Sequence, residues 1–154
     1  MSQHILMICH GNICRSPMAE RVARAHAERE CLDVTITSAG VSAEEDGNPI
    51  DRRAASVLRE AGYDASNHRA HQVTALEVRE ADLVVAAEEY HLDRLRRLVP
   101  DAENLHLFSE FDPEASTGDG LPDPWYGGMD GFHDTLAAVE RAMPALMERV
   151  RQNS

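Results

Sequence analysis

The sequence contains no lysine, so arginine supplies all 15 of its basic residues against 27 acidic ones. We take the missing lysine as a compositional bias of the genome and not as chemistry. The formal net charge of −12 at pH 7 argues against nucleic acids and acidic membrane surfaces as partners. Any anion site in this chain must therefore create positive potential locally, against the field of the whole molecule.

Long apolar runs, internal repeats, low-complexity tracts and linkers are also missing. The apolar runs fall far short of the ~18 residues needed to cross a bilayer. The first residues show neither the basic segment nor the cleavage site of a signal peptide. We therefore expect residues 1–154 to form a single cytoplasmic domain that buries a core and does not engage a membrane.

Cysteine is scarce, with three residues in 154, at positions 9, 14 and 31. An odd count, with two cysteines close together in a loop of catalytic type, argues for free thiols and against a disulfide framework.

Strands and helices are predicted to alternate along the chain. Apolar and β-branched runs predict strands at residues 4–8, 33–38, 82–87 and 104–108. Helical spacing predicts helices at residues 17–30, 50–61, 73–79 and 88–98, and a last one from 129 or 130 to 151. This order predicts a three-layer α/β fold, with helices on both faces of a parallel sheet. Ligands bind such sheets at the carboxyl ends of the strands.

The segment from Cys9 to Pro17, Cys-His-Gly-Asn-Ile-Cys-Arg-Ser-Pro, joins the first predicted strand to the first predicted helix. Backbone N–H groups of such a loop converge on one point, and the helix dipole adds positive potential there. We expect Gly11 to permit the turn, Ser16 to cap the helix and Pro17 to take its first position. The loop therefore predicts a site for a tetrahedral oxyanion.

Two side chains suit this oxyanion site. Thiols near a helix N-terminus and a fixed cation ionise more readily than free thiols, so Cys9 is a candidate nucleophile. Arg15 offers a planar group that matches two oxygens of a phosphoryl group. A Cys-x5-Arg pattern alone occurs often by chance, and it would then be a buried cysteine at a strand end and a surface arginine on a helix. The strand before it, the Gly-Asn pair within it and the Ser-Pro at the start of a helix favour the functional interpretation.

The loop resembles the signature Cys-x-Gly-Asn-x-Cys-Arg-Ser-Pro of the low-molecular-weight protein tyrosine phosphatases at every fixed position. The resemblance covers nearly the whole chain and implies a four-stranded parallel sheet. It implies hydrolysis of phosphotyrosine in proteins through a phosphocysteine intermediate, with no metal or other cofactor. Phosphotyrosine proteins are then the partners, and a tyrosine kinase is a candidate partner. The phosphate-binding residues are then His10, Gly11, Asn12, Ile13, Cys14 and Arg15.

The resemblance also assigns supporting roles. Asn12 and Ser16 are expected to hold the loop and to donate to the thiolate. Ser38 and His68 match a buried polar network that braces Asn12. A lone histidine is more often structural, and we expect a structural role for His68.

A general acid is needed because a phenolate leaving group, of pKa ~10, must gain a proton as its bond to phosphorus breaks. The segment Asp-Pro-Trp-Tyr at residues 123–126 resembles the family's Asp-Pro-Tyr-Tyr, whose aspartate is the general acid. Asp-Pro is also a common turn dipeptide, and Asp112 begins a competing one. The position just before the last helix favours Asp123, with Trp125 and Tyr126 as walls of an aryl-sized pocket.

Four positions depart from the family pattern. Glu44 falls where the family often has an aromatic or bulky residue at the pocket wall, His71 replaces an arginine, and Ala87-Glu88 replaces Met-Asp. These departures bear on substrate preference. We expect Glu44 and Glu45 to line the cleft opposite Trp125 and Tyr126.

Other activities remain as alternatives. An arsenate reductase of the same fold uses extra redox cysteines and no general acid; Asp123 and the absence of a C-terminal cysteine pair argue against it. A catalytically silent anion-binding module is disfavoured by the intact Cys9, Arg15 and Asp123. Related phosphoarginine phosphatases tend to carry threonine at the position of Ile13, so isoleucine favours phosphotyrosine.

Cys14 lies in the same loop as Cys9, with four residues between them. An accessible thiolate is prone to oxidation to a sulfenic acid, which a neighbouring thiol can trap as a disulfide. The loop curls around phosphate, so its two ends come close, and Cα atoms within ~7 Å of each other would permit the bond. The alternative is that Cys14 is a small buried core residue. We expect a redox role for Cys14 and none for Cys31.

Overall fold

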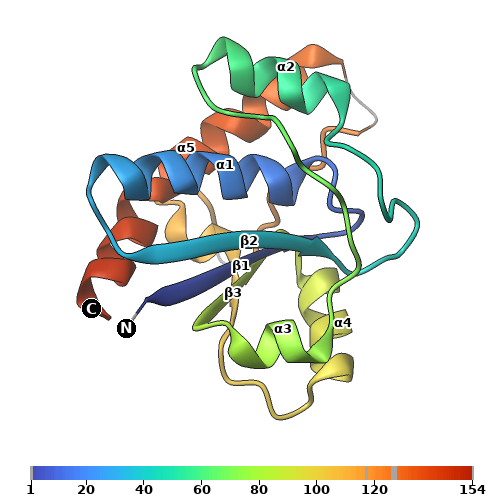
Figure 1. Cartoon of the computed structure of the whole chain (residues 1–154), viewed down its shortest axis with the longest axis vertical. Helices are drawn as coiled ribbons and strands as arrows, with labels where there is room; N and C mark the ends of the chain where they lie inside the picture. The colour runs from blue at the N-terminus through green and yellow to red at the C-terminus, as the bar shows by residue number, and fades with distance from the viewer. Residues whose placement is uncertain (1, 117, 126–127, 154) are drawn as a thin grey trace.

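The computed structural model describes residues 2–116, 118–125 and 128–153. Four parallel strands form one sheet in the order β2-β1-β3-β4 (Figure 1). They are β1 (Gln3–Cys9), β2 (Val34–Gly40), β3 (Leu83–Ala86) and β4 (Leu105–Leu107). The predicted α/β fold with a four-stranded parallel sheet is therefore confirmed.

Helices cover both faces of this sheet (Figure 1). One face packs against α1 (Arg15–Arg29) and α5 (Met129–Gln152), and α2 (Arg52–Glu60) packs against these two helices. The other face packs against α3 (Ala75–Glu80) and α4 (Glu89–Leu98). A short 3₁₀ helix, η1 (Phe108–Phe111), follows β4 directly. In the part of the chain that is described, no helix combines the length and the apolar character needed to span a bilayer.

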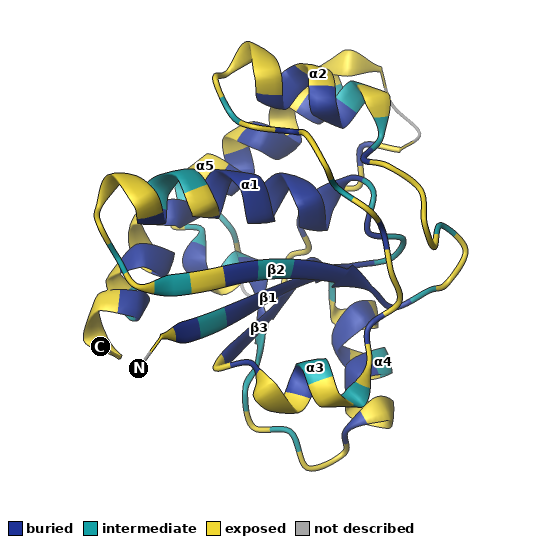
Figure 2. Ribbon diagram, in the orientation of Figure 1, coloured by how far each residue is buried: buried dark blue, intermediate teal, exposed yellow. Residues whose placement is uncertain are grey.

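The central strand β1 is buried on both sides, which explains its continuous apolar sequence. Ile5, Met7 and Cys9 enter the core beneath α1 and α5, whereas Leu6 and Ile8 enter the core above α3 and α4. Figure 2 shows the buried strands between helices whose outer faces are exposed. Because β1 pairs with β2 on one side and β3 on the other, the segments that follow β1 and β3 diverge and leave a crevice.

Helix α1 begins earlier than the sequence suggested. Its first residue is Arg15, and its N-cap is Cys14, which makes no side-chain capping bond. The prediction that Ser16 caps the helix and Pro17 occupies its first position is therefore wrong. The Ser16 hydroxyl instead lies 3.0 Å from the Cys9 sulfur. Pro17 still falls in the first turn, where N–H groups have no helical partner.

The turn after β1 depends on Asn12 as well as on Gly11. Asn12 has a φ of 62°, in the left-handed region that asparagine tolerates better than most residues. A Cβ at Gly11 would lie 3.1 Å from the Glu45 Cγ. Glycine at position 11 therefore makes room for a neighbouring side chain.

Gly40, at the end of β2, touches the same turn. It pairs with Cys9 in the sheet, and a Cβ on it would lie 2.6 Å from the carbonyl oxygen of His10 and 3.0 Å from the carbonyl carbon of Gly11. Both contacts are with backbone, which cannot rotate out of the way. The close approach of the two segments therefore requires glycine at position 40.

We expect Gly40→Ala to displace the loop that follows β1, at a cost of about 1–3 kcal/mol in the free energy of unfolding. Binding of inorganic phosphate, measured by calorimetry, should weaken at least about tenfold, because 1.4 kcal/mol corresponds to that factor. Gly128→Ala is the matched control, since a Cβ there meets nothing within 4 Å. Unchanged phosphate affinity in Gly40→Ala would show that the loop position does not depend on this contact.

Candidate active site

A cleft of about 240 Å³ opens at the carboxyl end of β1. The loop after β1 forms most of its wall, and the chain segments near residues 44 and 123 complete it. Its lining consists of Cys9, His10, Gly11, Ile13, Cys14, Arg15, Glu44, Glu45, Asp123 and Trp125. The structure thus brings Asp123 and Trp125 from the far end of the sequence to Cys9 and Arg15. Tyr126, predicted at the pocket wall, lies outside the described residues.

The peptide groups of the loop are oriented by hydrogen bonds to their carbonyl oxygens. These bonds are donated from outside the cleft, by Val41 N to Cys9 O (3.0 Å), Ser42 N to His10 O (3.0 Å), His68 Nε2 to Asn12 O (2.6 Å), Asp51 N to Ile13 O (2.8 Å) and Met18 N to Cys14 O (3.1 Å). In a trans peptide the N–H of the next residue points opposite to the C=O. The N–H groups of residues 10, 11, 13, 14 and 15 therefore turn toward the cleft that those residues line. Converging N–H groups bind anions.

The Cys9 sulfur lies at the base of this cleft, 3.0 Å from Ser16 Oγ. Asn12 Nδ2 donates a hydrogen bond to the same Ser16 oxygen, at 2.8 Å. Because Ser16 Oγ already accepts from Asn12, its own hydrogen is free to point at the sulfur. Ser16 is therefore placed to donate a hydrogen bond to the Cys9 sulfur.

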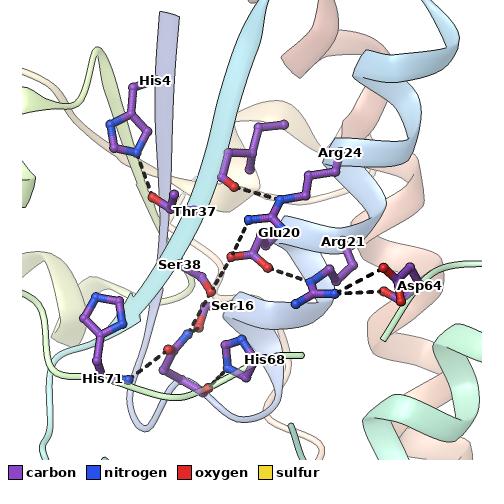
Figure 3. A network of polar contacts seen from close by, with 12 residues as sticks. His4, Ser16, Glu20, Arg21, Arg24, Thr37, Ser38, Asp64, His68 and His71 are labelled. Atoms are coloured by element: carbon purple, nitrogen blue, oxygen red, sulfur yellow. Dashed lines mark hydrogen bonds and ion pairs between the residues drawn. The ribbon is translucent and has the colours of Figure 1, made fainter. Parts of the chain in front are cut away.

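Asn12 is fully buried and its side chain is completely paired. Its amide nitrogen also donates to Ser38 Oγ at 3.0 Å, and Ser38 in turn donates to Glu20 Oε1 at 3.0 Å. Its amide oxygen accepts from His71 N at 3.2 Å. Figure 3 shows these contacts, including the ring of His68 at the Asn12 carbonyl. The network holds Asn12 in its left-handed conformation and ties the loop to β2 and α1.

Glu20 is a member of this network that the sequence analysis missed. Its side chain is 5% exposed, and Oε2 accepts from Arg21 Nε at 2.7 Å. The only signal in the sequence was a carboxylate among the apolar positions of the first helix. A buried charge of this kind is retained only when it is paired and hydrogen-bonded, and both conditions are met here.

His68 is predicted to be structural, and its ring is half-buried beside Asn12. A carbonyl oxygen only accepts, so Nε2 of His68 carries the hydrogen. Burial lowers the pKa of His68 below its ordinary value, which keeps the ring neutral at pH 7.

Arg15 is charged and yet only 3% exposed. Its Nη1 donates to the carbonyl oxygen of Leu121 at 3.0 Å and lies 2.9 Å from Glu88 Oε2. Its Nη2 lies 3.6 Å from Asp123 Oδ2. Glu88 was visible in the sequence only as a departure from the family pattern, and its pairing with Arg15 was not predicted.

The two candidate acids occupy different places. Asp123 lines the cleft, and its Oδ1 accepts from Trp125 N at 3.0 Å. Asp112 instead pairs with Arg141 Nη2 at 3.2 Å and is absent from the lining of the cleft. The geometry therefore favours Asp123 over Asp112 as the carboxyl group nearest to a bound ligand.

Cys14 is 6% exposed and lines the same cleft as Cys9. Burial, and next the carboxylate of Asp51, raise the pKa of Cys14 well above the ordinary thiol range. Cys14 is therefore a thiol at neutral pH. Cys31 is exposed after the end of α1 and does not line the cleft.

The sequence model of the low molecular weight phosphotyrosine protein phosphatases matches residues 4–154. The chain belongs to this family. It is 42% identical over 158 aligned positions to the low molecular weight protein-tyrosine-phosphatase of Streptomyces coelicolor, covering 99% of this chain and 96% of that one. It is 39% identical to low molecular weight protein-tyrosine phosphatase A of Mycobacterium tuberculosis, covering 96% and 91% of the two chains. These relatives make the chain an enzyme of the protein-tyrosine-phosphatase class.

The solved structures agree with this assignment. A protein tyrosine phosphatase from Entamoeba histolytica, with Hepes in its active site, superimposes on this phosphatase with a TM-score of 0.92. The two sequences are 27% identical, and the superposition covers 99% of each chain.

His91, in α4, is 1% exposed. Its Nδ1 accepts from Glu88 N at 3.1 Å, whereas Nε2 has no hydrogen-bond partner among the described residues and lies 3.9 Å from Glu88 Oε2. Burial, and next the positive charge of Arg15, lower the pKa of His91 to about 3. The unfolded chain binds a proton at this ring near pH 6.5, so the native state is stabilised by His91 above that pH. This stabilisation is lost as the pH falls from about 6.5 toward 3.

We expect His91→Asn to reduce the loss of stability in acid, because the asparagine Oδ1 can accept from Glu88 N without binding a proton. The free energy of unfolding in urea should fall between pH 6 and pH 5 by about 1 kcal/mol more in the wild type than in the variant. His133→Asn, at an exposed position, is the control and should behave like the wild type. Equal losses in the wild type and His91→Asn would contradict the assigned role of His91.

Proposed function

We propose that this phosphatase acts in the cytoplasm and hydrolyses phosphotyrosine in proteins through a phosphocysteine intermediate. The proposal rests on one observation above all: Cys9, Arg15 and Asp123 meet in a single cleft whose wall is the loop after β1. Phosphotyrosine proteins are the partners, and a tyrosine kinase that forms them is a candidate partner.

In the first step, the Cys9 thiolate attacks phosphorus and forms the S–P bond as the P–O bond to the phenol breaks. Asp123, protonated, transfers its proton to the departing oxygen. Arg15 and the N–H groups of the loop bind the equatorial oxygens, so the charge of the transition state is met by fixed donors. The Ser16 hydroxyl, 3.0 Å from the Cys9 sulfur, helps to position it for attack.

In the second step, water attacks the phosphocysteine and Asp123 accepts its proton. The S–P bond breaks, and the electron pair returns to the Cys9 sulfur. The hydrogen bond from Ser16 now stabilises the departing thiolate. The free enzyme and inorganic phosphate result.

The walls of the cleft define the substrate that fits. Trp125 supplies an aromatic surface to the lining, as an aryl phosphate requires, and Glu44 and Glu45 supply carboxylates to it. Glu44 also lies 3.5 Å from His10 Nε2. Carboxylates at the rim repel acidic peptides, so we propose a preference for phosphotyrosine without acidic neighbours.

The role of Asp123 is tested by aryl phosphates whose leaving groups differ in pKa. We expect Asp123→Asn to lower kcat/KM for phenyl phosphate by about 100-fold or more, because that leaving group needs the proton. The loss for 4-nitrophenyl phosphate should be much smaller, since its phenolate leaves without help. Equal slowing of both substrates would reject Asp123 as the acid.

Turnover measurements on the purified enzyme distinguish between the alternative substrates. Phosphotyrosine and phosphoarginine peptides of one sequence are compared, with Cys9→Ser as the inactive control. Faster turnover of the phosphoarginine peptide would overturn the assignment of substrate while leaving the chemistry at Cys9 intact. Reduction of arsenate with a thiol donor is the third arm of the comparison.

We also propose that Cys14 protects Cys9 from irreversible oxidation. Peroxide converts the Cys9 thiolate to a sulfenic acid, and the Cys14 thiol then condenses with it, releasing water and forming a disulfide. The proposal is supported by the place of both sulfurs in one cleft and by the protonated state of Cys14, which leaves Cys9 as the first thiol to react.

Peroxide should inactivate the wild type reversibly, with activity restored by dithiothreitol. Cys14→Ser should recover little of its own starting activity after the same treatment, because its sulfenic acid proceeds to the sulfinic acid. Cys31→Ser is the control and should recover like the wild type. Full recovery of Cys14→Ser would show that Cys14 serves packing alone.

A further inference from the structure

Arg53, the second residue of α2, lies outside the lining of the cleft and yet contacts the segment that carries Asp123. Its Nη1 donates to the carbonyl oxygen of Trp125 at 3.3 Å. Its guanidinium carbon lies 5.2 Å from the centre of the Trp125 ring and 4.7 Å from that of Phe132. The guanidinium therefore contacts two aromatic rings and one backbone oxygen at the same time.

The other edge of the same guanidinium is fixed by Asp51. Nε donates to Asp51 Oδ1 and Nη2 donates to Asp51 Oδ2, both at 3.2 Å. Asp51 is also the N-cap of α2, because Oδ1 accepts from Arg53 N at 2.8 Å. Its own N–H donates to the carbonyl oxygen of Ile13, in the loop after β1, at 2.8 Å. Arg53 is therefore tied through one residue to the phosphate-binding loop.

At the far end of this chain of contacts, Trp125 N donates to Asp123 Oδ1 at 3.0 Å. The orientation of the Asp123 carboxyl group thus depends on the position of the Trp125 backbone, which Arg53 contacts. We propose that Arg53 is a positioning residue that holds the segment of Asp123 at its working distance from the phosphate-binding loop. The inference rests on the proposed role of Asp123 as the general acid.

Of the two aromatic rings that Arg53 contacts, only that of Phe132 is held firmly by its surroundings. Phe132 is fully buried in α5, which packs alongside α2 (Figure 1), whereas 41% of Trp125 is exposed. Without Arg53, no described contact joins the Trp125 ring to α2. Arginine suits this place because its planar group pairs with a carboxylate through one edge and stacks on aromatic rings through its face. Lysine offers neither geometry.

A simpler role for Arg53 is to stabilise the start of α2 through Asp51. That role predicts a lower melting temperature and an equal effect on every substrate. A positioning role predicts an effect that depends on the leaving group, because only poor leaving groups need the proton of Asp123. The two roles therefore differ in kinetics even where they agree in stability.

The test compares kcat/KM for phenyl phosphate and 4-nitrophenyl phosphate in Arg53→Met, Arg53→Lys and the control Arg52→Met. Arg52 is the exposed neighbour of Arg53. We expect Arg53→Met to lose about tenfold or more for phenyl phosphate, a part of what a general acid contributes, and much less for 4-nitrophenyl phosphate. Arg53→Lys should show the same selective loss in a folded protein of unchanged charge. Arg52→Met should match the wild type with both substrates.

Asp123→Asn is assayed in parallel. The role of Asp123 as general acid and the positioning role of Arg53 can then be tested independently. If Asp123→Asn is selective for the poor leaving group and both Arg53 variants slow the two substrates equally, the positioning role is overturned and the general acid stands. If Asp123→Asn itself shows no selectivity, the proposed acid is wrong and the inference falls with it. Lower melting temperatures with unchanged kcat/KM in both Arg53 variants would also overturn the positioning role.

Discussion

The orientation of the peptide planes between Cys9 and Arg15 is the constraint on which the rest of this structure depends. Five carbonyl oxygens of this loop accept bonds from the residues after β2, from α1, from the N-cap of α2 and from the segment of His68, so their opposite N–H groups are held toward the cleft. The surrounding fold supplies these bonds before any ligand arrives, and donors fixed in advance need no reorganisation during reaction. The glycine at position 40 and the left-handed Asn12 follow from the same requirement.

A second constraint is the charge of Arg15. A buried guanidinium without partners costs several kcal/mol, and this chain satisfies it with a carbonyl oxygen and two carboxylates, from Glu88 and Asp123. The acidic surplus of the sequence is thus compatible with an anion site, because the positive potential comes from one buried cation and a set of N–H groups. The fold provides the pairing partners from the segments that follow β3 and β4.

The sequence predicted the order of strands and helices and the place of the cleft, because buried parallel strands and the Cys9–Pro17 segment carry strong local patterns. It misplaced the start of α1, since the capping preference of serine was outweighed by the contact of Ser16 with Cys9. It named Gly11 for the turn but did not anticipate the left-handed conformation of Asn12. Glu20, Arg53 and Glu88 were missed because their roles arise from tertiary contacts between segments far apart in the chain, which local periodicity does not encode.

The two carboxylates on Arg15 are not equivalent, and the difference bears on how a substrate enters. Glu88 lies 2.9 Å from Nη1, whereas Asp123 lies 3.6 Å from Nη2, so the contact with Asp123 is the weaker one. We expect a phosphate dianion to compete for the same guanidinium and to displace the weaker partner at the smaller cost. The hydrogen bond from Trp125 N to Asp123 does not involve Arg15, so we expect it to persist when Asp123 leaves Arg15. In the proposed mechanism, the contacts that hold Trp125 then decide where the carboxyl group stands once phosphate is bound.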